Sequence, residues 1–265
     1  MTEAALRSRL ADIRCFVLDM DGTIYLGDRL FPFTKTFLEK AAGAGREVCF
    51  FTNNSSRCAA DYVEKLARME IAVPPERMLT SGQVAGAYLR REHPGQGVFL
   101  QGTPALRREL ETLGVPLEEA HPQVVVLGFD TTLEYDRLRR TCDLVREGLP
   151  YLGVNPDLNC PVEGGFIPDC GSIARLIEAS TGRTPLFLGK PSQETLRFLL
   201  ERTGCREEEL AVVGDRLYTD IALAQGTKAL SILVMTGETT PEMLRESAIQ
   251  PSLTAASLEE IAACL

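Results

Sequence analysis

The sequence predicts an α/β fold in which a parallel sheet carries the functional residues, with a second α/β unit set into the chain. Two observations predict it. Short apolar runs of strand length alternate with segments of helical spacing along most of the 265 residues. The runs at 15–18, 47–51 and 210–213 end abruptly in polar or acidic residues. Because ligands of open α/β sheets bind at the carboxyl ends of strands, we expect the functional site there.

The first apolar run ends in Asp19, Met20, Asp21, Gly22 and Thr23. Asp19 and Asp21 are two positions apart, so in extended chain their side chains leave in the same general direction. At about 4 Å and an effective dielectric near 20, their repulsion is roughly 4 kcal/mol. A hard cation with oxygen ligands, above all Mg²⁺, would relieve it. The competing interpretation is an acidic turn after a strand.

A helix is expected over 33–44, followed by a second buried strand over 47–51 and a helix over 57–69. Thr52 lies directly at the end of that strand. The N–H groups at the start of the following helix are available to an anion, so we place Thr52 in the site. The serines that follow are explained equally well as N-caps.

From residue 82 the pattern restarts, with helices expected over 82–92, 104–113 and 135–147 and strands over 98–100 and 124–127. This stretch has enough apolar runs for a core of its own. The segment 153–165 is expected to be a loop, because it is rich in turn-forming residues and amides. Within it, Asn155 and Asp157 are candidates for contact with a ligand, although a plain turn explains Asn-Pro-Asp as well.

After a helix over 172–180 and an extended segment over 185–188, Lys190 precedes Pro191, which is expected near the start of a helix to about 202. The strand over 210–213 then leads into Gly214 and Asp215, repeating the arrangement at Asp19. Asp220 follows in what would be a helix start, where a carboxylate is also favoured by the helix dipole. A further strand over 229–235 and terminal helices complete the chain.

Composition excludes several classes of function. The 28 Lys and Arg residues against 37 Asp and Glu give a net charge of −9, so nucleic acid and anionic membranes are not expected partners. No apolar run is long enough for a membrane span and the first residues do not resemble a signal peptide, so a cytoplasmic protein is expected. Eight cysteines without a CxxC pair and two histidines make a zinc site improbable. Cys160 and Cys170 could meet across the loop, but reduced thiols are expected in a cytosolic chain.

In chain order, DxDGT, Thr-Asn, Lys and GDxxxxD resemble the four motifs of the haloacid dehalogenase (HAD) superfamily of phosphohydrolases. Asp19 and Thr52 are 33 positions apart, which leaves room for only a helix and a strand, whereas 138 positions separate Thr52 from Lys190. A cap between the second and third motifs is similar to that of the subfamily IIA phosphatases, which act on UMP, 4-nitrophenyl phosphate or phosphoglycolate. The resemblance implies a Rossmann-like core over 1–81 and 181–265, and an inserted α/β cap over 82–180.

The resemblance also implies roles for single residues. It makes Asp19 the nucleophile that forms an aspartyl phosphate, and Asp21 the acid and then the base. Mg²⁺ would be held by the Asp19 carboxylate, the Asp21 carbonyl and Asp215. Oxygens of the phosphoryl group would be held by Thr52, the Asn53 backbone and Lys190. Asn155 and Asp157 are the candidates for reaching the site from the cap. Asp220 would orient Lys190 or metal-bound water.

Arg216 departs from the UMP phosphatase pattern, which usually has Asn after the metal-binding Asp. The backbone role of this position should persist, while outer contacts with the substrate would differ. The expected activity is Mg²⁺-dependent hydrolysis of a small phosphate ester, such as a nucleotide, sugar, glycerol or glycolate phosphate. Two alternatives are a phosphotransferase or mutase using the same intermediate, and a non-catalytic sensor of phosphorylated metabolites. A homodimer through the cap occurs in such families and stays open.

Overall fold

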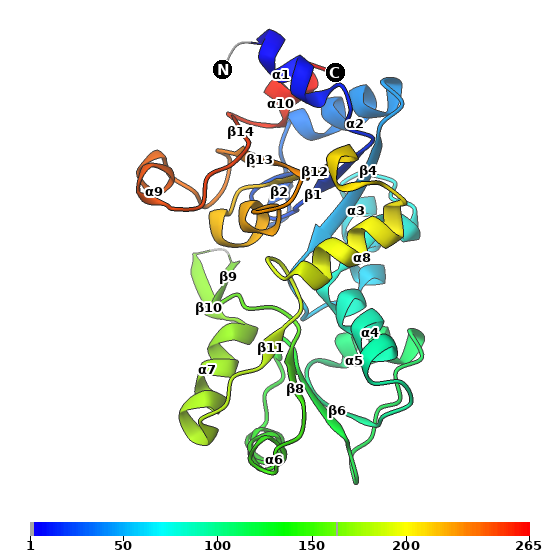
Figure 1. Ribbon diagram of the computed structural model, residues 1–265, viewed down its shortest axis with the longest axis vertical. Coiled ribbons are helices and arrows are strands. Elements are labelled where there is room, and N and C mark those ends of the chain that lie inside the picture. Colours follow the sequence, from blue (N-terminus) through cyan, green and yellow to red (C-terminus); the bar gives the residue numbers. More distant parts are fainter. Residues whose placement is uncertain (1–2, 163) are drawn as a thin grey trace. The chain divides into compact units, whose positions relative to one another are not determined.

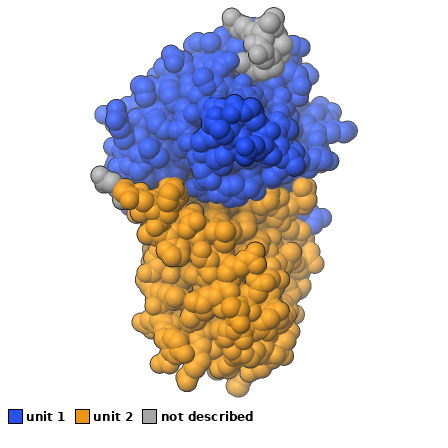
Figure 2. Space-filling view, turned by 90° about the vertical axis from the view of Figure 1, so that its left-hand side faces the viewer, with its two compact units in different colours: residues 1–51, 63–79, 196–265 blue, residues 52–62, 80–195 orange. Residues whose placement is uncertain are grey.

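The computed structural model describes residues 3–162 and 164–265, which form two compact units (Figure 2). The first unit comprises Met1–Phe51, Val63–Leu79 and Leu196–Leu265, and the second comprises Thr52–Tyr62 and Thr80–Thr195. All of the residues 82–180, which the sequence assigns to a cap, belong to the second unit. Among the described residues, no helix combines the length and the apolar character needed to cross a membrane.

A six-stranded sheet, with strand order β14-β13-β12-β1-β4-β5, organises the first unit (Figure 1). β1 pairs in parallel with β12 and with β4, and its last residue, Leu18, lies opposite Val213 and Phe50. All four residues of β1 are buried, as expected for a strand covered on both faces. The strands are β1 (Cys15–Leu18), β4 (Glu47–Thr52), β5 (Met78–Thr80), β12 (Leu210–Gly214), β13 (Leu230–Val234) and β14 (Leu253–Ala255).

The helices of this unit bury apolar faces against the sheet and against each other. Phe37 of α2 meets Phe16 of β1 edge to face, with ring centroids 5.4 Å apart. α2 also packs against α10. The chain passes between the units within α3 (Ala59–Arg68) and α8 (Gln193–Thr203). The other helices are α1 (Glu3–Leu10), α2 (Phe33–Gly43), α9 (Pro241–Glu246) and α10 (Leu258–Ala262), and short 3₁₀ turns cover Pro75–Arg77 and Glu207–Glu209.

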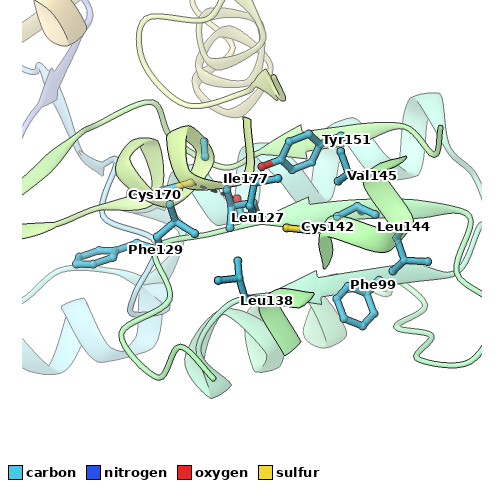
Figure 3. Close-up of a cluster of buried hydrophobic side chains, with 13 residues drawn as sticks. Phe99, Leu127, Phe129, Leu138, Cys142, Leu144, Val145, Tyr151, Cys170 and Ile177 are labelled. Carbon is cyan, nitrogen blue, oxygen red and sulfur yellow. Dashed lines mark hydrogen bonds between the residues drawn. The ribbon is translucent and has the colours of Figure 1, made fainter. Parts of the chain in front are cut away.

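The second unit has a parallel four-stranded sheet of its own, in the order β11-β8-β7-β6. Its hydrophobic core joins these strands to α6 and α7, and Leu127, Val145 and Ile177 are among its fully buried members (Figure 3). The strands are β6 (Val98–Gln101), β7 (Val124–Leu127), β8 (Tyr151–Gly153) and β11 (Leu186–Phe187). The helices are α4 (Ser81–Glu92), α5 (Pro104–Thr112), α6 (Tyr135–Arg146) and α7 (Cys170–Thr181). The predicted α/β fold with a second α/β unit is thus confirmed.

Short strands occur in several places where the sequence analysis expected none. The segment 153–165 is not a loop throughout, because β9 (Asn159–Val162) and β10 (Gly165–Pro168) form an antiparallel hairpin. A second hairpin joins β2 (Tyr25–Leu26) to β3 (Arg29–Leu30), and β14 precedes the last helix. In β9 and β10, Pro161 and Pro168 interrupt the pattern and neither strand has a buried face, so the alternation that marks a strand is absent.

Candidate active site

Three carboxylates gather in the first unit where neighbouring strands end. Asp19 follows β1 directly, and Asp215 follows β12, the strand paired with β1. Asp220 comes from a π-helical turn over Leu217–Ile221 that begins two residues after Asp215. One carboxylate oxygen from each of the three lies within 4.8 Å of the other two. The parallel pairing therefore brings together residues that are about 200 positions apart in the sequence.

Asp215 is buried among these charges and only partly satisfied. Its Oδ2 accepts a hydrogen bond from the backbone N–H of Glu238 at 2.6 Å, whereas its buried Oδ1 has no partner among the described residues. Burial, and then the neighbouring Asp220, raise the pKa of Asp215 to about 7. An unpartnered carboxylate oxygen beside two more carboxylates fits a hard divalent cation such as Mg²⁺, which takes oxygen ligands.

Glycines line the same cluster because no side chain would fit against it. A Cβ at Gly22 would lie 2.5 Å from Asp215 Oδ2, and Gly22 also has a positive φ of +85°. A Cβ at Gly237 would collide with the same carboxylate. The hydroxyl of Thr236 donates to the carbonyl of Gly22 at 2.6 Å, which ties the loop after β13 to the turn after β1. The backbone of both loops is thus held against Asp215.

Asp21 is not one of the three clustered carboxylates. It lies in the turn between β1 and β2, where the N–H of Gly22 donates to the carbonyl of Tyr25 at 2.8 Å. The Tyr25 hydroxyl donates to Asp21 Oδ2 at 3.3 Å, and Lys65 Nζ lies 3.9 Å from the centroid of the Tyr25 ring. The turn therefore places Asp21 beside Tyr25, which gives one of its carboxylate oxygens a hydrogen-bond donor.

Arg216 and Asp220 contribute to the same loop in different ways. The guanidinium of Arg216 forms an ion pair with Glu238, with 3.0 Å between Nε and Oε2. The backbone N–H of Arg216 donates to Asp220 Oδ2 at 3.1 Å. Gly214 is needed beside Asp220, since a Cβ there would collide with that carboxylate. Asp220 is therefore packed into the loop as well as facing the cluster.

The remaining predicted residues lie in the second unit. Thr52 is the last residue of β4, and its hydroxyl accepts from the N–H of Asn54 at 3.1 Å. Asn53 and Lys190 are joined by hydrogen bonds, and both are buried. Asn155 and Asp157 lie in the same buried network, where Asn155 Nδ2 donates to Asp157 Oδ2 at 3.0 Å. Hydrogen bonds thus connect Asn53, Lys190, Asn155 and Asp157 in one network. The side chains of Asn155 and Asp157 are paired with protein groups in it.

Sequence reasoning overlooked the loop after β13, which supplies Thr236, Gly237, Glu238 and Thr239. The Thr239 hydroxyl, like its N–H, donates to the carbonyl of Asp215. The signal was available, because the apolar run 230–234 ends in Met-Thr-Gly-Glu-Thr just as the other strands end in polar residues. No disulfide joins Cys160 to Cys170, and none of the eight cysteines, all of which lie in the described part of the chain, forms one.

Comparison with known proteins agrees with this arrangement. The sequence profile of haloacid dehalogenase-like hydrolases matches residues 16–116, and an HAD-hydrolase-like profile matches residues 187–261. The acid sugar phosphatase of Staphylococcus aureus (strain MRSA252) is 32% identical over 248 residues, which cover 93% of this chain and 96% of that protein.

Solved structures give the same result. The 4-nitrophenylphosphatase of Thermotoga maritima is 44% identical, with a TM-score of 0.93 over 96% of this chain and 98% of that one. The p-nitrophenyl phosphatase of Archaeoglobus fulgidus is 28% identical, with a TM-score of 0.90 over 96% and 100%. The family predicted from the motifs is confirmed. The chain belongs to the haloacid dehalogenase-like hydrolases, as a phosphatase of subfamily IIA that acts on phosphorylated substrates.

Proposed function

We propose that this phosphatase hydrolyses small phosphomonoesters with Mg²⁺ and through an aspartyl phosphate on Asp19. The observation that carries the proposal is the cluster of Asp19, Asp215 and Asp220, with a buried oxygen of Asp215 that has no partner among the described residues. Three carboxylates at this separation repel each other strongly unless a cation is bound. A cation at this cluster would adjoin the proposed nucleophile.

The carboxylates of Asp19 and Asp215 and the backbone carbonyl of Asp21 would hold Mg²⁺. When bound, the ion neutralises charge on the oxygens of the phosphoryl group. The glycine-lined loops support this assignment, because Gly22 and Gly237 let the backbone approach Asp215 closely. Asp220 keeps a position beside the other two carboxylates and is proposed to orient the groups around them.

In the first step, a carboxylate oxygen of Asp19 attacks the phosphorus atom and the ester P–O bond breaks. The leaving oxygen takes a proton from Asp21. In the second step, Asp21 takes a proton from water, the water oxygen attacks phosphorus, and the bond from phosphorus to Asp19 breaks. Inorganic phosphate leaves and Asp19 is regenerated. The hydrogen bond from the Tyr25 hydroxyl to Asp21 Oδ2 supports this role, because it helps to hold the carboxyl group in place for proton transfer.

The oxygens of the phosphoryl group that do not bind the cation are proposed to be held by Thr52, the Asn53 N–H and Lys190. A fixed ammonium group and backbone N–H groups stabilise the charge that develops in the transition state. Arg216 is proposed to act through its backbone, since its guanidinium forms an ion pair with Glu238. Direct contact of Asn155 and Asp157 with the substrate stays a prediction, and their buried pairing favours a supporting role.

The names of the relatives suggest where to begin the search for a substrate. Acid sugar phosphatase and 4-nitrophenylphosphatase are the names of similar proteins, so sugar phosphates and 4-nitrophenyl phosphate come first. Nucleotide, glycerol and glycolate phosphates complete the panel.

Phosphate release should be measured for wild type and Asp19→Asn, with Mg²⁺ and with EDTA. We expect Mg²⁺-dependent release that Asp19→Asn abolishes, and acid-quenched wild type that carries one phosphoryl group on Asp19. If Asp19→Asn released phosphate at near wild-type rates, Asp19 would not be the nucleophile. An isomerised sugar phosphate in place of inorganic phosphate would indicate a mutase. Tight binding without release would indicate a sensor.

A further inference from the structure

The side chain of Asn53 forms hydrogen bonds with both the backbone N–H and the backbone carbonyl of Lys190. Asn53 Oδ1 accepts from the N–H of Lys190 at 2.9 Å, and Asn53 Nδ2 donates to the carbonyl of Lys190 at 2.9 Å. The two residues are 137 positions apart. Because the amide directs one donor and one acceptor at Lys190, it pairs with this backbone as a neighbouring strand would. Lys190 and Asn53 are buried, with 2% and 7% of their surfaces exposed.

Asp157 determines which way the Asn53 amide faces. Asn53 Nδ2 also donates to Asp157 Oδ2 at 2.8 Å, so a flipped amide would place its oxygen against a carboxylate and its nitrogen against the N–H of Lys190. Asp157 is itself held, because the same oxygen accepts from Asn155 Nδ2 at 3.0 Å. Asn155 continues the chain of hydrogen bonds to Asp169, the N-cap of α7.

Close packing at Gly189 gives independent support for this arrangement. A Cβ at Gly189 would lie 2.8 Å from Asn53 Oδ1 and 2.7 Å from the carbonyl oxygen of Val154. The segment before Lys190 therefore approaches Asn53 as closely as its backbone allows. The N–H of Gly189 donates to that same carbonyl at 2.8 Å.

We infer that Asn53 is a positioning residue, which fixes the backbone of Lys190 and thereby the place of the ammonium group that binds the phosphoryl oxygens, with Asp157 as the group that orients it. The inference rests on the proposed function, in which Lys190 binds those oxygens. It assigns to the Asn53 side chain a task that its backbone, as a proposed phosphate ligand, does not perform. It also assigns to Asp157 a task that requires no contact with the substrate.

A double-mutant cycle between Asn53→Ala and Lys190→Ala tests the inference. The readouts are kcat and KM for 4-nitrophenyl phosphate and the inhibition constant of inorganic phosphate. Lys190→Ala should lower kcat/KM by at least 100-fold. Asn53→Ala alone should lower it about tenfold or more and weaken phosphate inhibition. In the Lys190→Ala background, Asn53→Ala should add less than about threefold, because its effect passes through the missing ammonium.

A matched control separates positioning from general loss of structure. Thr195 is buried, and its hydroxyl donates to the carbonyl of Leu188 at 2.8 Å, in the same segment as Lys190. Thr195→Val removes this hydrogen bond at nearly constant volume. It should lower the urea midpoint while leaving the phosphate inhibition constant within about twofold of wild type.

A second variant pair tests the role of Asp157. Asn53→Asp places a carboxylate against Asp157 and against the carbonyl of Lys190, so we expect activity at or below that of Asn53→Ala. Adding Asp157→Asn removes one of the two like charges and should recover at least fivefold in kcat/KM. No recovery would show that Asp157 does not orient position 53.

The outcomes distinguish the inference from the function on which it rests. If Lys190→Ala changes kcat/KM less than a few-fold, the phosphate-binding role of Lys190 is wrong and the inference fails with it. If Lys190→Ala has its full effect but Asn53→Ala costs the same factor in both backgrounds, Lys190 keeps its role and the positioning inference alone is refuted.

Discussion

Replacing Asp215 by Asn should stabilise the metal-free protein and abolish its response to Mg²⁺. The carboxylate oxygens of Asp19, Asp215 and Asp220 lie within 4.8 Å of one another. At this separation and an effective dielectric near 20, each pair of charges repels by roughly 3.5 kcal/mol. An amide at position 215 removes the charge and can keep the hydrogen bond from Glu238 through its oxygen.

The expected gain in the stability of the metal-free protein is smaller than the repulsion that the substitution removes. The amide nitrogen of the variant would occupy the place of Asp215 Oδ1, and an unsatisfied buried group costs about 1–3 kcal/mol. The carboxylates of Asp19 and Asp220 are suitable acceptors for it, which lowers that cost. We therefore expect a net stabilisation of about 2 kcal/mol in EDTA, or roughly 4–8 °C in melting temperature.

Thermal unfolding with EDTA and with increasing Mg²⁺ measures both effects. Wild type should gain about 2.7 kcal/mol when free Mg²⁺ reaches about 100 times its dissociation constant, whereas the Asp215→Asn variant should gain almost nothing. Asp130→Asn is the control, because Asp130 is also buried but accepts from Thr132 and from Gln101. That variant should lose stability and keep the Mg²⁺ response. An Asp215→Asn variant that melts below wild type in EDTA, or is still stabilised by Mg²⁺, would refute the reasoning.

Three further changes have defined outcomes. Gly22→Ala adds a methyl group 2.5 Å from Asp215 Oδ2 at a φ of +85°, where an L residue is strained. Half-activation in a Mg²⁺ titration should therefore need at least about tenfold more metal. An unchanged midpoint of that titration would contradict the close packing. Burial raises the pKa of Glu109 to about 7 from an ordinary value of 4.5. The folded state then binds more protons at Glu109 than the unfolded chain, so this carboxyl alone lowers the stability of wild type by about 3 kcal/mol as pH rises from 4.5 to 7. Glu109→Gln does not titrate, so its melting temperature relative to wild type should rise between pH 5 and pH 8; a constant difference would contradict the raised pKa. Tyr25→Phe removes the hydrogen bond to Asp21 Oδ2 and should slow alkyl phosphates several-fold more than 4-nitrophenyl phosphate, whose leaving group needs less protonation. An equal loss of rate with both substrates would show that Tyr25 does not assist proton transfer to the leaving group.

The buried strands were the most predictable part of the fold. The run Val124–Leu127 is a strand over the residues expected, because four consecutive apolar residues between polar segments have few alternatives. The hairpin of β9 and β10 could not be predicted in this way. Phe166 is 68% exposed there, and neither strand buries a face that would impose a period of two on the sequence. Strands that contribute no side chains to a hydrophobic core show no alternation of apolar and polar residues in the sequence.

The site was predictable to the extent that sheet topology determines it. Asp19 and Asp215 both follow buried strands, and parallel strands present their carboxyl ends at one edge of the sheet. Their positions at strand ends therefore predict that the two residues lie close together. The same rule would have found the loop after β13, where Glu238 donates to Asp215, had every polar strand end been treated alike.

The division of labour among the polar residues was not predictable, because it depends on partners far away in the chain. Asn53 and Asn155 are both amides in polar loops, and a ligand contact is a reasonable expectation for either. In the folded chain, the amide of Asn53 forms hydrogen bonds with Lys190, 137 positions away, and with Asp157. The amide of Asn155 donates to Asp157 and to Asp169. A buried side chain with its hydrogen bonds directed at protein can influence a substrate only through the groups that it holds. The ammonium of Lys190 is the group through which this network would act, and double-mutant cycles rather than single substitutions are therefore the measurements that can reveal its role.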